Sequence, residues 1–375
     1  MKNLLKVCII ALFILVTATS KSAHATTYQV GLQRESKVLQ PLLAKLQPGD
    51  VVEIDPGEYQ EVMKITSNGT AEAPIIIRGI KGGERPIFNA EGINTSGAGP
   101  VPRGIFQIEG AYIIIEHLEF KNARNGENSA GIRLLNSTNA IIRDCKISLC
   151  DMGIFGGDRE TALIENCDVG FNSTEKRNGY AHNFYMSGNR VVVRNSFIHD
   201  CPFGQNFKSR AHYNELWYNR IANSNEGEVG IVDGENDTDR PNSNSLLVGN
   251  IIVSPRERTG NNWKFILFGS ESGHTHDGTL FLLNNTFIAG NEKIKFISLA
   301  DAKANAIIRN NVFVGSEQIL NTMQTPMDVT ASGNWKPSGT PLPEGWADAI
   351  HTPLLYIDGD GVTQALVESG STPTN

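Results

Sequence analysis

The chain repeats a short motif in which two or three apolar residues are closed by a polar one. The motif occurs eight times, at residues 114–117, 141–144, 163–166, 192–195, 216–219, 247–250, 282–285 and 307–310. Neighbouring closing residues are 22 positions apart at the shortest step, Asp144 to Asn166, and 35 at the longest, Asn250 to Asn285. Self-similarity at such a period is the signature of a solenoid. The shortest step predicts the bare coil, and the longer steps predict loops inserted at one corner.

A second set of apolar segments recurs at the same period, at residues 131–134, 153–156, 183–186, 206–209 and 230–233. Two strand positions in each coil predict at least two parallel sheets that run up the same solenoid, with neighbouring strands about 4.8 Å apart. A propeller needs a larger period, and the Leu/Asn consensus of leucine-rich repeats is absent. We therefore predict an all-β, right-handed parallel β-helix. Asn or Asp closes seven of the eight motifs, which predicts Asn side chains that hydrogen-bond along the stack.

The first 25 residues are typical of a signal peptide. Lys2 and Lys6 precede the apolar run 7–16, and Ala23-His24-Ala25 supplies the small residues of a cleavage site. The run is too short for a comfortable membrane span. We expect a periplasmic or extracellular protein that has no membrane association after cleavage.

The rest of the chain divides by its pattern. Residues 26–48 are predicted to form an N-terminal cap with a short helix, because a solenoid must cover its open end. Residues 49–320 are predicted to form the β-helix, and residues 321–375 an irregular tail. The formal net charge of −7 argues against a nucleic acid partner. After cleavage four cysteines remain, either as disulfides or as buried fillers: Cys145, Cys150, Cys167 and Cys201.

Alternation along the second set of segments separates inward from outward side chains. The apolar column Ile132, Ile154, Phe184, Phe207 and Ile231 must face the core. The column beside it then faces solvent and contains Arg133, Phe155, Tyr185, Lys208 and Val232. Arg210, two residues beyond Lys208, shares this outward face. The pattern thus predicts a basic and phenolic patch on an acidic protein, although solvent-facing strand residues are often simply charged.

Such a patch suits β-elimination from a uronic-acid polysaccharide. Arg210 would neutralise the substrate carboxylate, so that the charge developed after loss of the C5 proton is tolerated. Lys208 is the candidate base and Tyr185 the candidate acid for the departing oxygen, or the two exchange roles. His182, at the start of the same strand, is a further base candidate.

The N-terminal stretch resembles the opening coil of chondroitinase B and related alginate lyases, in residues 48–54, 57–59 and 68–78. Residues 182–185, 208–210 and 219–220 are similar to a pattern found in other right-handed β-helix repeat proteins. The resemblance implies that a Lys base and an Arg act together, often with Ca²⁺ on the substrate carboxylate. Arg133, Asn206 and Arg220 are the candidate substrate-binding residues.

An acidic run lies beside the patch and offers oxygen ligands of the kind Ca²⁺ prefers. It does not match an EF-hand loop, and a solvated loop is the alternative interpretation. The candidate calcium ligands are Glu228, Asp233 and Glu235.

Taken together, these patterns predict a secreted lyase that acts on an acidic polysaccharide. A C5-epimerase shares the first proton abstraction and is the nearest enzymatic alternative. A non-catalytic glycan-binding protein is the alternative outside the enzymes. The paired Asp-Asp and Gly-His-Gly segments of polygalacturonase-type hydrolases do not occur.

Overall fold

The computed structural model describes residues 25–258, 264–301, 303–322 and 328–336, together with the backbone of two later strands. Residues 1–24, which carry most of the expected signal peptide, lie outside the described residues. No helix in the described part is long and apolar enough to cross a membrane.

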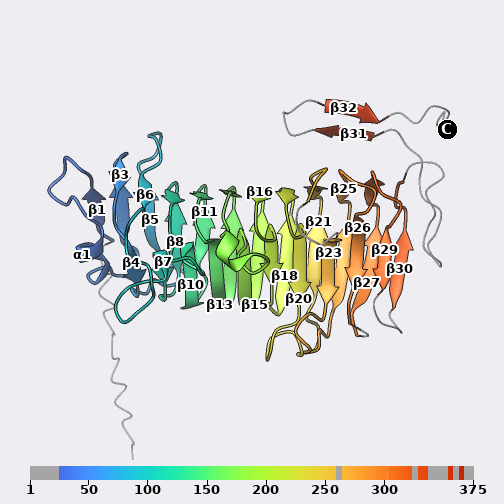
Figure 1. The fold of residues 1–375 in the computed structure, drawn as a ribbon. Helices are drawn as coiled ribbons and strands as arrows, with labels where there is room; N and C mark the ends of the chain where they lie inside the picture. The colour runs from blue at the N-terminus through green and yellow to red at the C-terminus, as the bar shows by residue number, and fades with distance from the viewer. Residues whose placement is uncertain are drawn as a thin grey trace, which may run out of the picture.

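The described chain forms three columns of short parallel strands (Figure 1). The first contains β4 (Met63–Ile65), β7 (Gly104–Ile108), β10 (Ala130–Ser137), β13 (Met152–Glu165), β15 (Phe184–Arg194), β17 (Phe207–Ser209), β20 (Val229–Val232), β23 (Lys264–Gly269), β26 (Lys295–Leu299) and β29 (Leu320–Thr322). The second contains β1 (Thr27–Val30), β2 (Val51–Ile54), β5 (Ile75–Gly79), β8 (Ile113–Glu116), β11 (Ile141–Arg143), β18 (Tyr213–Trp217), β21 (Ser245–Val248), β24 (Thr279–Leu283), β27 (Asn305–Arg309) and β30 (Val329–Ser332). β13 and β15 are long enough to belong to both columns.

The third column forms a separate ten-stranded sheet. It contains β3 (Glu58–Tyr59), β6 (Ile87–Asn89), β9 (Glu119–Lys121), β12 (Lys146–Ser148), β14 (Asp168–Gly170), β16 (Phe197–Cys201), β19 (Arg220–Ser224), β22 (Ile251–Val253), β25 (Thr286–Ile288) and β28 (Val312–Val314). Because the strands of all three columns pair in parallel with the strand one coil away, the prediction of a parallel β-helix is confirmed.

The interior is filled by the inward residue of each alternating pair, and like side chains stack on like. Phe184 and Phe207 have ring centroids 5.8 Å apart, and Phe287 stacks on Phe313 at 5.1 Å. One core cluster runs from Val30 to Ile319. Each coil therefore buries its apolar face only against its neighbours, as a solenoid requires.

The two ends of the stack differ from the prediction. In the expected cap, α1 (Gln40–Leu43) is a single helical turn, and β1 is already the first strand of the second column. At the other end the coils continue past residue 320, because β30 pairs with β27 and Trp335 forms a bridge with Val312. β30 alternates half-buried and exposed residues, so it lacks the apolar motif that marks earlier coils. Within the predicted irregular tail, β31 (Leu354–Ile357) and β32 (Thr363–Leu366) also pair, in antiparallel fashion.

The predicted Asn ladder exists, but one residue beyond the bend. A residue in the left-handed region ends the second column in successive coils: His117, Asp144, Asn166, Asn195, Tyr218, Gly249, Asn284 and Asn310. The next residue points inward, and Asn219, Asn250 and Asn285 hydrogen-bond there with Nδ2 to Oδ1 distances of 3.1 and 2.9 Å. The prediction that these three Asn residues lie at the bend was wrong by one position. Tyr218, Gly249 and Asn284 occupy the bend in these coils.

The four cysteines are buried free thiols, so the filler interpretation is correct among the described residues. Cys145 and Cys167 occupy the inward position that Asn219 and later asparagines hold further up the stack. Their Sγ atoms contact backbone carbonyl oxygens, at 3.3 Å in each case. A small, weakly polar side chain therefore fits where the ladder has not yet begun.

Inserted loops leave the stack at two corners, not at the single corner predicted. Loops 122–129 and 171–183, the latter with a 3-10 turn at Glu175–Arg177, connect the third column to the first. Loops 233–244 and 270–278 connect the first column to the second. The first column is thus flanked by loops on both sides around β15, β17 and β20.

Candidate functional site

The outward column of the first sheet is as predicted over four coils. Arg133 pairs in register with Phe155, Phe155 with Tyr185, and Tyr185 with Lys208. The next member is Gly230, because β17 pairs Phe207 with Val229. The prediction of Val232 in this column, and of Ile231 above Phe207, was therefore wrong by two residues. Because side chains alternate along a strand, a shift of two residues keeps inward side chains inward. The outward face of the strand was therefore still assigned correctly.

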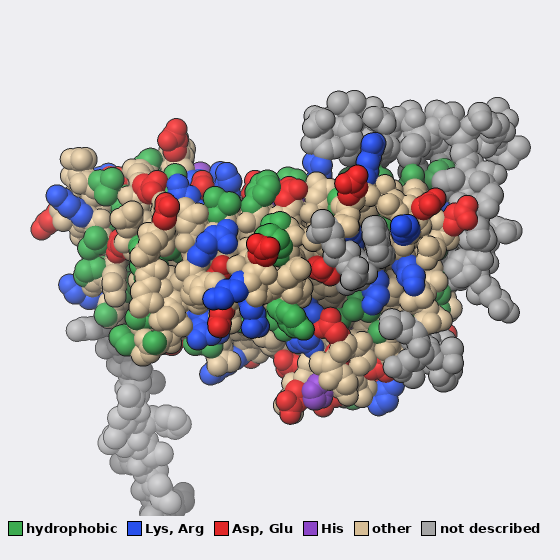
Figure 2. Space-filling view, viewed as in Figure 1, with side chains coloured by type: hydrophobic (Ala, Val, Ile, Leu, Met, Phe, Trp, Pro, Cys, Tyr) green, Lys and Arg blue, Asp and Glu red, His purple; other side chains and the backbone are tan. Residues whose placement is uncertain are grey.

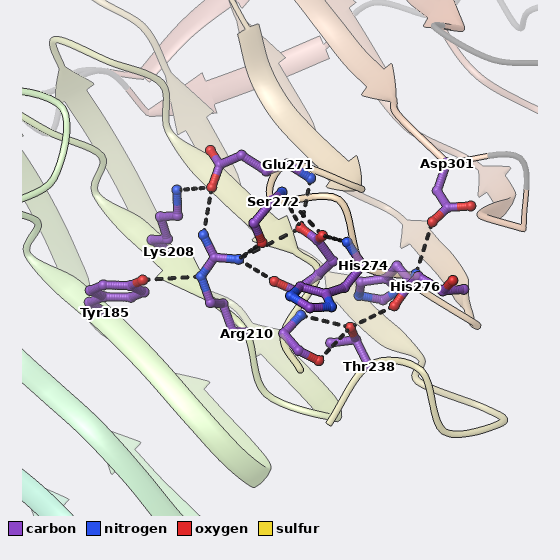
Figure 3. A network of polar contacts seen from close by, with 12 residues as sticks. Tyr185, Lys208, Arg210, Thr238, Glu271, Ser272, His274, His276 and Asp301 are labelled. Atoms are coloured by element: carbon purple, nitrogen blue, oxygen red, sulfur yellow. Dashed lines mark hydrogen bonds and ion pairs between the residues drawn. The ribbon is translucent and has the colours of Figure 1, made fainter. Parts of the chain in front are cut away.

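Lys208 and Arg210 meet at one carboxylate, that of Glu271, and Arg210 also contacts Tyr185 (Figure 3). Arg210 reaches back one coil, and its Nε donates to Tyr185 Oη at 3.1 Å. Its Nη2 donates to Glu271 Oε2 at 2.8 Å, and Lys208 Nζ donates to the same oxygen. The phenol, the ammonium and the guanidinium are thus neighbours on one wall, with Glu271 as a fourth member that the sequence reasoning missed.

The loop that carries Glu271 is fixed by Asp233. The buried Asp233 carboxylate accepts hydrogen bonds from the backbone N–H groups of Glu271 at 2.6 Å, Ser272 at 3.0 Å and His274 at 2.6 Å. Burial alone would raise the pKa of Asp233, but these N–H donors outweigh it and hold the pKa below its ordinary value. Asp233 is therefore an anchor for the loop 270–278.

The four side chains line a cavity of about 490 Å³ between the two sets of loops. Its wall consists of Gly179, Tyr180, His182, Tyr185, Gln205, Lys208, Arg210, Glu226, Glu271 and Ser272. A volume in this range suits a small number of sugar residues.

His182 is present in the cavity wall, but as a neutral donor. Its Nδ1 accepts a hydrogen bond from the backbone N–H of Gln205 at 3.0 Å, which leaves the ring proton on Nε2. Burial, with Lys208 and Arg210 nearby, holds the pKa of His182 well below its ordinary value. The ring also packs edge-on against Tyr185, at 5.3 Å. This geometry does not suit the base role considered for His182.

Asn206 and Arg220 do not line the cavity. The Asn206 side chain is buried inside the coil, where its Nδ2 donates to Ala222 O at 2.7 Å and to Glu228 Oε2 at 2.6 Å. Arg220 lies in the third column and stacks over Phe197 at 4.8 Å. The structure therefore removes both from the candidate site, because one faces inward and the other lies on a different sheet.

The three candidate calcium ligands do not form a metal site. Glu228 is buried and bound to Arg258 at 2.8 Å, Asp233 is engaged by the loop backbone, and Glu235 is exposed. Within the residues that the structure describes, no group of three or more His, Cys, Asp or Glu side chains could hold a metal ion. These donors do not fit Ca²⁺, which needs several converging oxygens.

The loop 270–278 contains an unusual buried histidine, and we predict that it weakens the fold in acid. Both ring nitrogens of His276 lack a hydrogen-bond partner among the described residues, and the ring packs on Phe268 at 4.4 Å. Burial lowers the pKa of His276 to about 4. Between pH 6.5 and 4 the unfolded chain takes up a proton there that the folded chain does not. Stability is therefore lost as the pH falls through this window, by roughly 2–3 kcal/mol at pH 4.5.

The measurement is the free energy of unfolding in urea at pH 7 and pH 4.5, for the native protein and for His276→Phe. The variant should lose less stability on acidification than the native protein does. An equal loss in both proteins would show that His276 does not contribute.

Glu271 was missed because it lies 63 residues from Lys208, in a loop whose direction periodicity does not encode. One signal was present in the sequence. The longest step between motifs, from Asn250 to Asn285, contains Glu271 and marks the largest insertion.

Comparison with known proteins supports the architecture. The family model described as right handed beta helix region matches residues 130–335. An alginate lyase from Paenibacillus sp. str. FPU-7 is similar with a TM-score of 0.57 and 16% identity, over 81% of this chain and 99% of that one. A rhamnogalacturonan lyase gives 0.58 and 14%, over 83% and 87%. A glycoside hydrolase gives 0.64 and 8%, over 84% and 97%.

At these identities the neighbours show the fold alone. A search of curated proteins finds no match. The family model covers more than half of the chain, and the three columns of parallel strands have the architecture that it describes. The chain therefore belongs to the right-handed β-helix family.

Proposed function

We propose that this protein is a secreted lyase that cleaves a uronic-acid-containing glycan by β-elimination. One observation carries the proposal: Lys208 and Arg210 both bind one carboxylate oxygen, that of Glu271, beside the hydroxyl of Tyr185. A pair of cations spaced to share a carboxylate is what a uronate needs for its C5 proton to become removable. The signal peptide expected at residues 1–25 supports secretion.

The reaction removes one proton from the sugar and supplies one to the departing oxygen. A base removes the C5 proton, a double bond forms between C4 and C5, the C4–O bond breaks, and the departing oxygen gains a proton. The negative charge that develops on the carboxylate is the largest electrostatic problem, and fixed donors in a cavity are effective against it. We assign carboxylate binding to Arg210 and Lys208.

Tyr185 is the better candidate for proton transfer. Its Oη accepts a hydrogen bond from Arg210 Nε at 3.1 Å, so the guanidinium stabilises negative charge on that oxygen. Lys208 instead donates to a carboxylate and is only 6% exposed. Of the two assignments that the sequence allowed, the geometry thus favours the one in which Tyr185 is the base. His182 Nε2–H is a second donor for the substrate or the departing oxygen.

The test is a panel of polymers: alginate, glucuronan, chondroitin and pectate. β-Elimination on any of them creates an unsaturated uronate that absorbs in the ultraviolet. New reducing ends without absorbance would identify a hydrolase. Inverted uronate in an uncut chain would identify an epimerase, and binding without any product would leave a glycan-binding protein. Each of these three outcomes contradicts the lyase.

Tyr185→Phe should lower kcat on the cleaved polymer by at least about 100-fold, because a proton-transfer group in the transition state contributes this much. The substitution removes one oxygen from a half-buried side chain, so the fold should persist. Tyr213→Phe, on β18 in the second column, is the matched control and should keep full activity. Activity of Tyr185→Phe within a few-fold of the native rate would exclude Tyr185 as the proton-transfer group.

A second candidate function is glycoside hydrolysis, because two carboxylates, Glu226 and Glu271, line the same cavity. Burial raises the pKa of Glu226, as a general acid of a glycosidase requires. The polymer panel separates the two functions, and so does Glu226→Gln. A hydrolase should lose at least about 100-fold in rate, whereas the lyase should keep its activity.

A further inference from the structure

A second groove adjoins the candidate site on the side toward the N-terminus. It has a volume of about 530 Å³ and lies at the corner between the first and second columns. β13 and β15 continue through this corner, and the strand register shifts there, between Leu135 and Ser137 of β10 and between Asp158 and Thr161 of β13. Its side chains include Arg133, Phe155, Arg159, Ser187, Asn189 and Arg240.

Arg133 has unused hydrogen-bonding capacity in this groove. Its Nη1 is buried and has no hydrogen-bond partner among the described residues. The guanidinium lies over Phe155, 4.5 Å from the ring centroid, and Phe155 stacks on Tyr185 at 5.5 Å. A buried donor without a partner is costly and rare in native proteins. Arg133 is thus positioned over Phe155 at the groove wall, with a donor that the described residues leave unpaired.

The rest of the groove is also suited to an anion. Arg159 is exposed, and Arg240 donates from Nε to the backbone oxygen of Asp237 at 3.2 Å. Its other contacts are longer, to the Asp237 carboxylate at 3.4 Å and to Asn189 at 3.5 Å. Asp158 does not offset this charge, because its carboxylate is buried and accepts bonds from Ser137 and from backbone N–H groups. In the space-filling view several Lys and Arg side chains lie over the middle of the stack, with Asp and Glu side chains among them (Figure 2).

The spacing connects this groove to the site. Arg133 lies two coils from Tyr185, which corresponds to about 10 Å along the stack. A glycan that leaves the cavity along the column reaches Arg133 within a few sugar residues.

We propose that this groove, with Arg133 and Arg240, binds a second carboxylate of the same glycan chain. The inference rests on the proposed function and extends it. The substrate is then a polymer whose acidic groups recur along the chain, and it lies along the stack with one end directed toward the N-terminal coils. A disaccharide that fills the candidate site is too short to reach the groove.

Calorimetric binding of uronate oligosaccharides tests this assignment without turnover, in the Tyr185→Phe background. The probes are galacturonate, mannuronate and glucuronate oligomers of two and five residues, and their carboxyl-reduced counterparts. Arg133→Ala and Arg240→Ala should each weaken binding of an acidic pentamer about tenfold, the loss expected for one charge-assisted contact. Neither variant should change binding of the dimer, and the reduced pentamers should bind weakly to all proteins. Arg309→Ala, on β27 in the second column, is the charge-matched control.

The outcomes separate this inference from the proposed function. Binding that depends on Arg133 and Arg240, in a protein that cleaves no polymer, would reject the lyase and retain the groove. Cleavage with the same affinity in the native protein and both variants would reject the groove alone. Failure of every acidic pentamer to bind would also overturn the groove. Because Arg240 lies on the surface, its variant remains informative even if Arg133→Ala does not fold.

Discussion

Arg210→Ala should lower kcat/KM on the cleaved polymer by about a thousandfold, because it removes a preorganised donor from a charged transition state. The side chain serves two parts of the site at once. Its Nε holds Tyr185 Oη at 3.1 Å, and its Nη2 shares Glu271 with Lys208. Without it the substrate carboxylate loses a charged partner and the phenol loses the charge beside it. The measurement is initial rate against polymer concentration, followed by ultraviolet absorbance.

The loop around Arg210 should survive the substitution. Asp233 still binds the backbone N–H groups of the loop 270–278 when Arg210 is absent, so Glu271 keeps its anchor. Arg210→Lys keeps the charge but not the planar fork, and should recover only part of the activity. Arg194→Ala, which breaks an exposed pair with Glu165 on the second column, is the control and should be fully active. A loss of less than tenfold in Arg210→Ala would contradict its role in carboxylate binding.

Two periods in the sequence predict part of the site: the length of one coil and the alternation of side chains along a strand. The coil period places Tyr185 beside Lys208, and the strand period turns both side chains outward. Neither period depends on knowing the loops. The two errors in register both arise because the coils differ in length. Val229 lies where Ile231 was predicted, two residues away, and Asn219 lies one residue beyond the bend at which it was predicted. A displacement of two preserves the face of a strand, and so the patch was found in spite of it.

The part that could not be predicted depends on long-range contacts. Glu271 approaches Lys208 because Asp233 holds a loop two coils further along the stack, and no spacing in the sequence specifies that contact. Asn206 and Arg220 were misplaced for a different reason. Both follow the repeat, but the sequence did not reveal that each coil has a third column, nor which polar residues continue an interior ladder.

The interior ladder that contains Asn206 is separate from the one at Asn219, and it ends at Glu228. Removing the Glu228 carboxylate should cause the largest loss of stability. The buried chain of amides runs from Asn183 to Asn206 at 2.8 Å, and from Asn206 to Glu228 at 2.6 Å. Beyond it, Glu228 Oε1 accepts from Arg258 Nη2 at 2.8 Å, and neither side chain is exposed. Truncating one partner of a buried ion pair removes the charge that offsets most of the other's burial. Glu228→Ala should therefore lower the free energy of unfolding by about 4 kcal/mol.

Two further variants determine whether charge or shape is responsible for that loss. Burial raises the pKa of Glu228 to about 7, so Glu228→Gln resembles a form that the native protein can adopt and should cost less than the alanine variant. Replacing both partners, as Glu228→Leu with Arg258→Met, removes the buried charges together and should recover much of the stability. The measurement is urea unfolding at pH 7. A loss below about 1 kcal/mol in Glu228→Ala would contradict a stabilising role for this buried pair, since breaking a buried pair costs several times that amount.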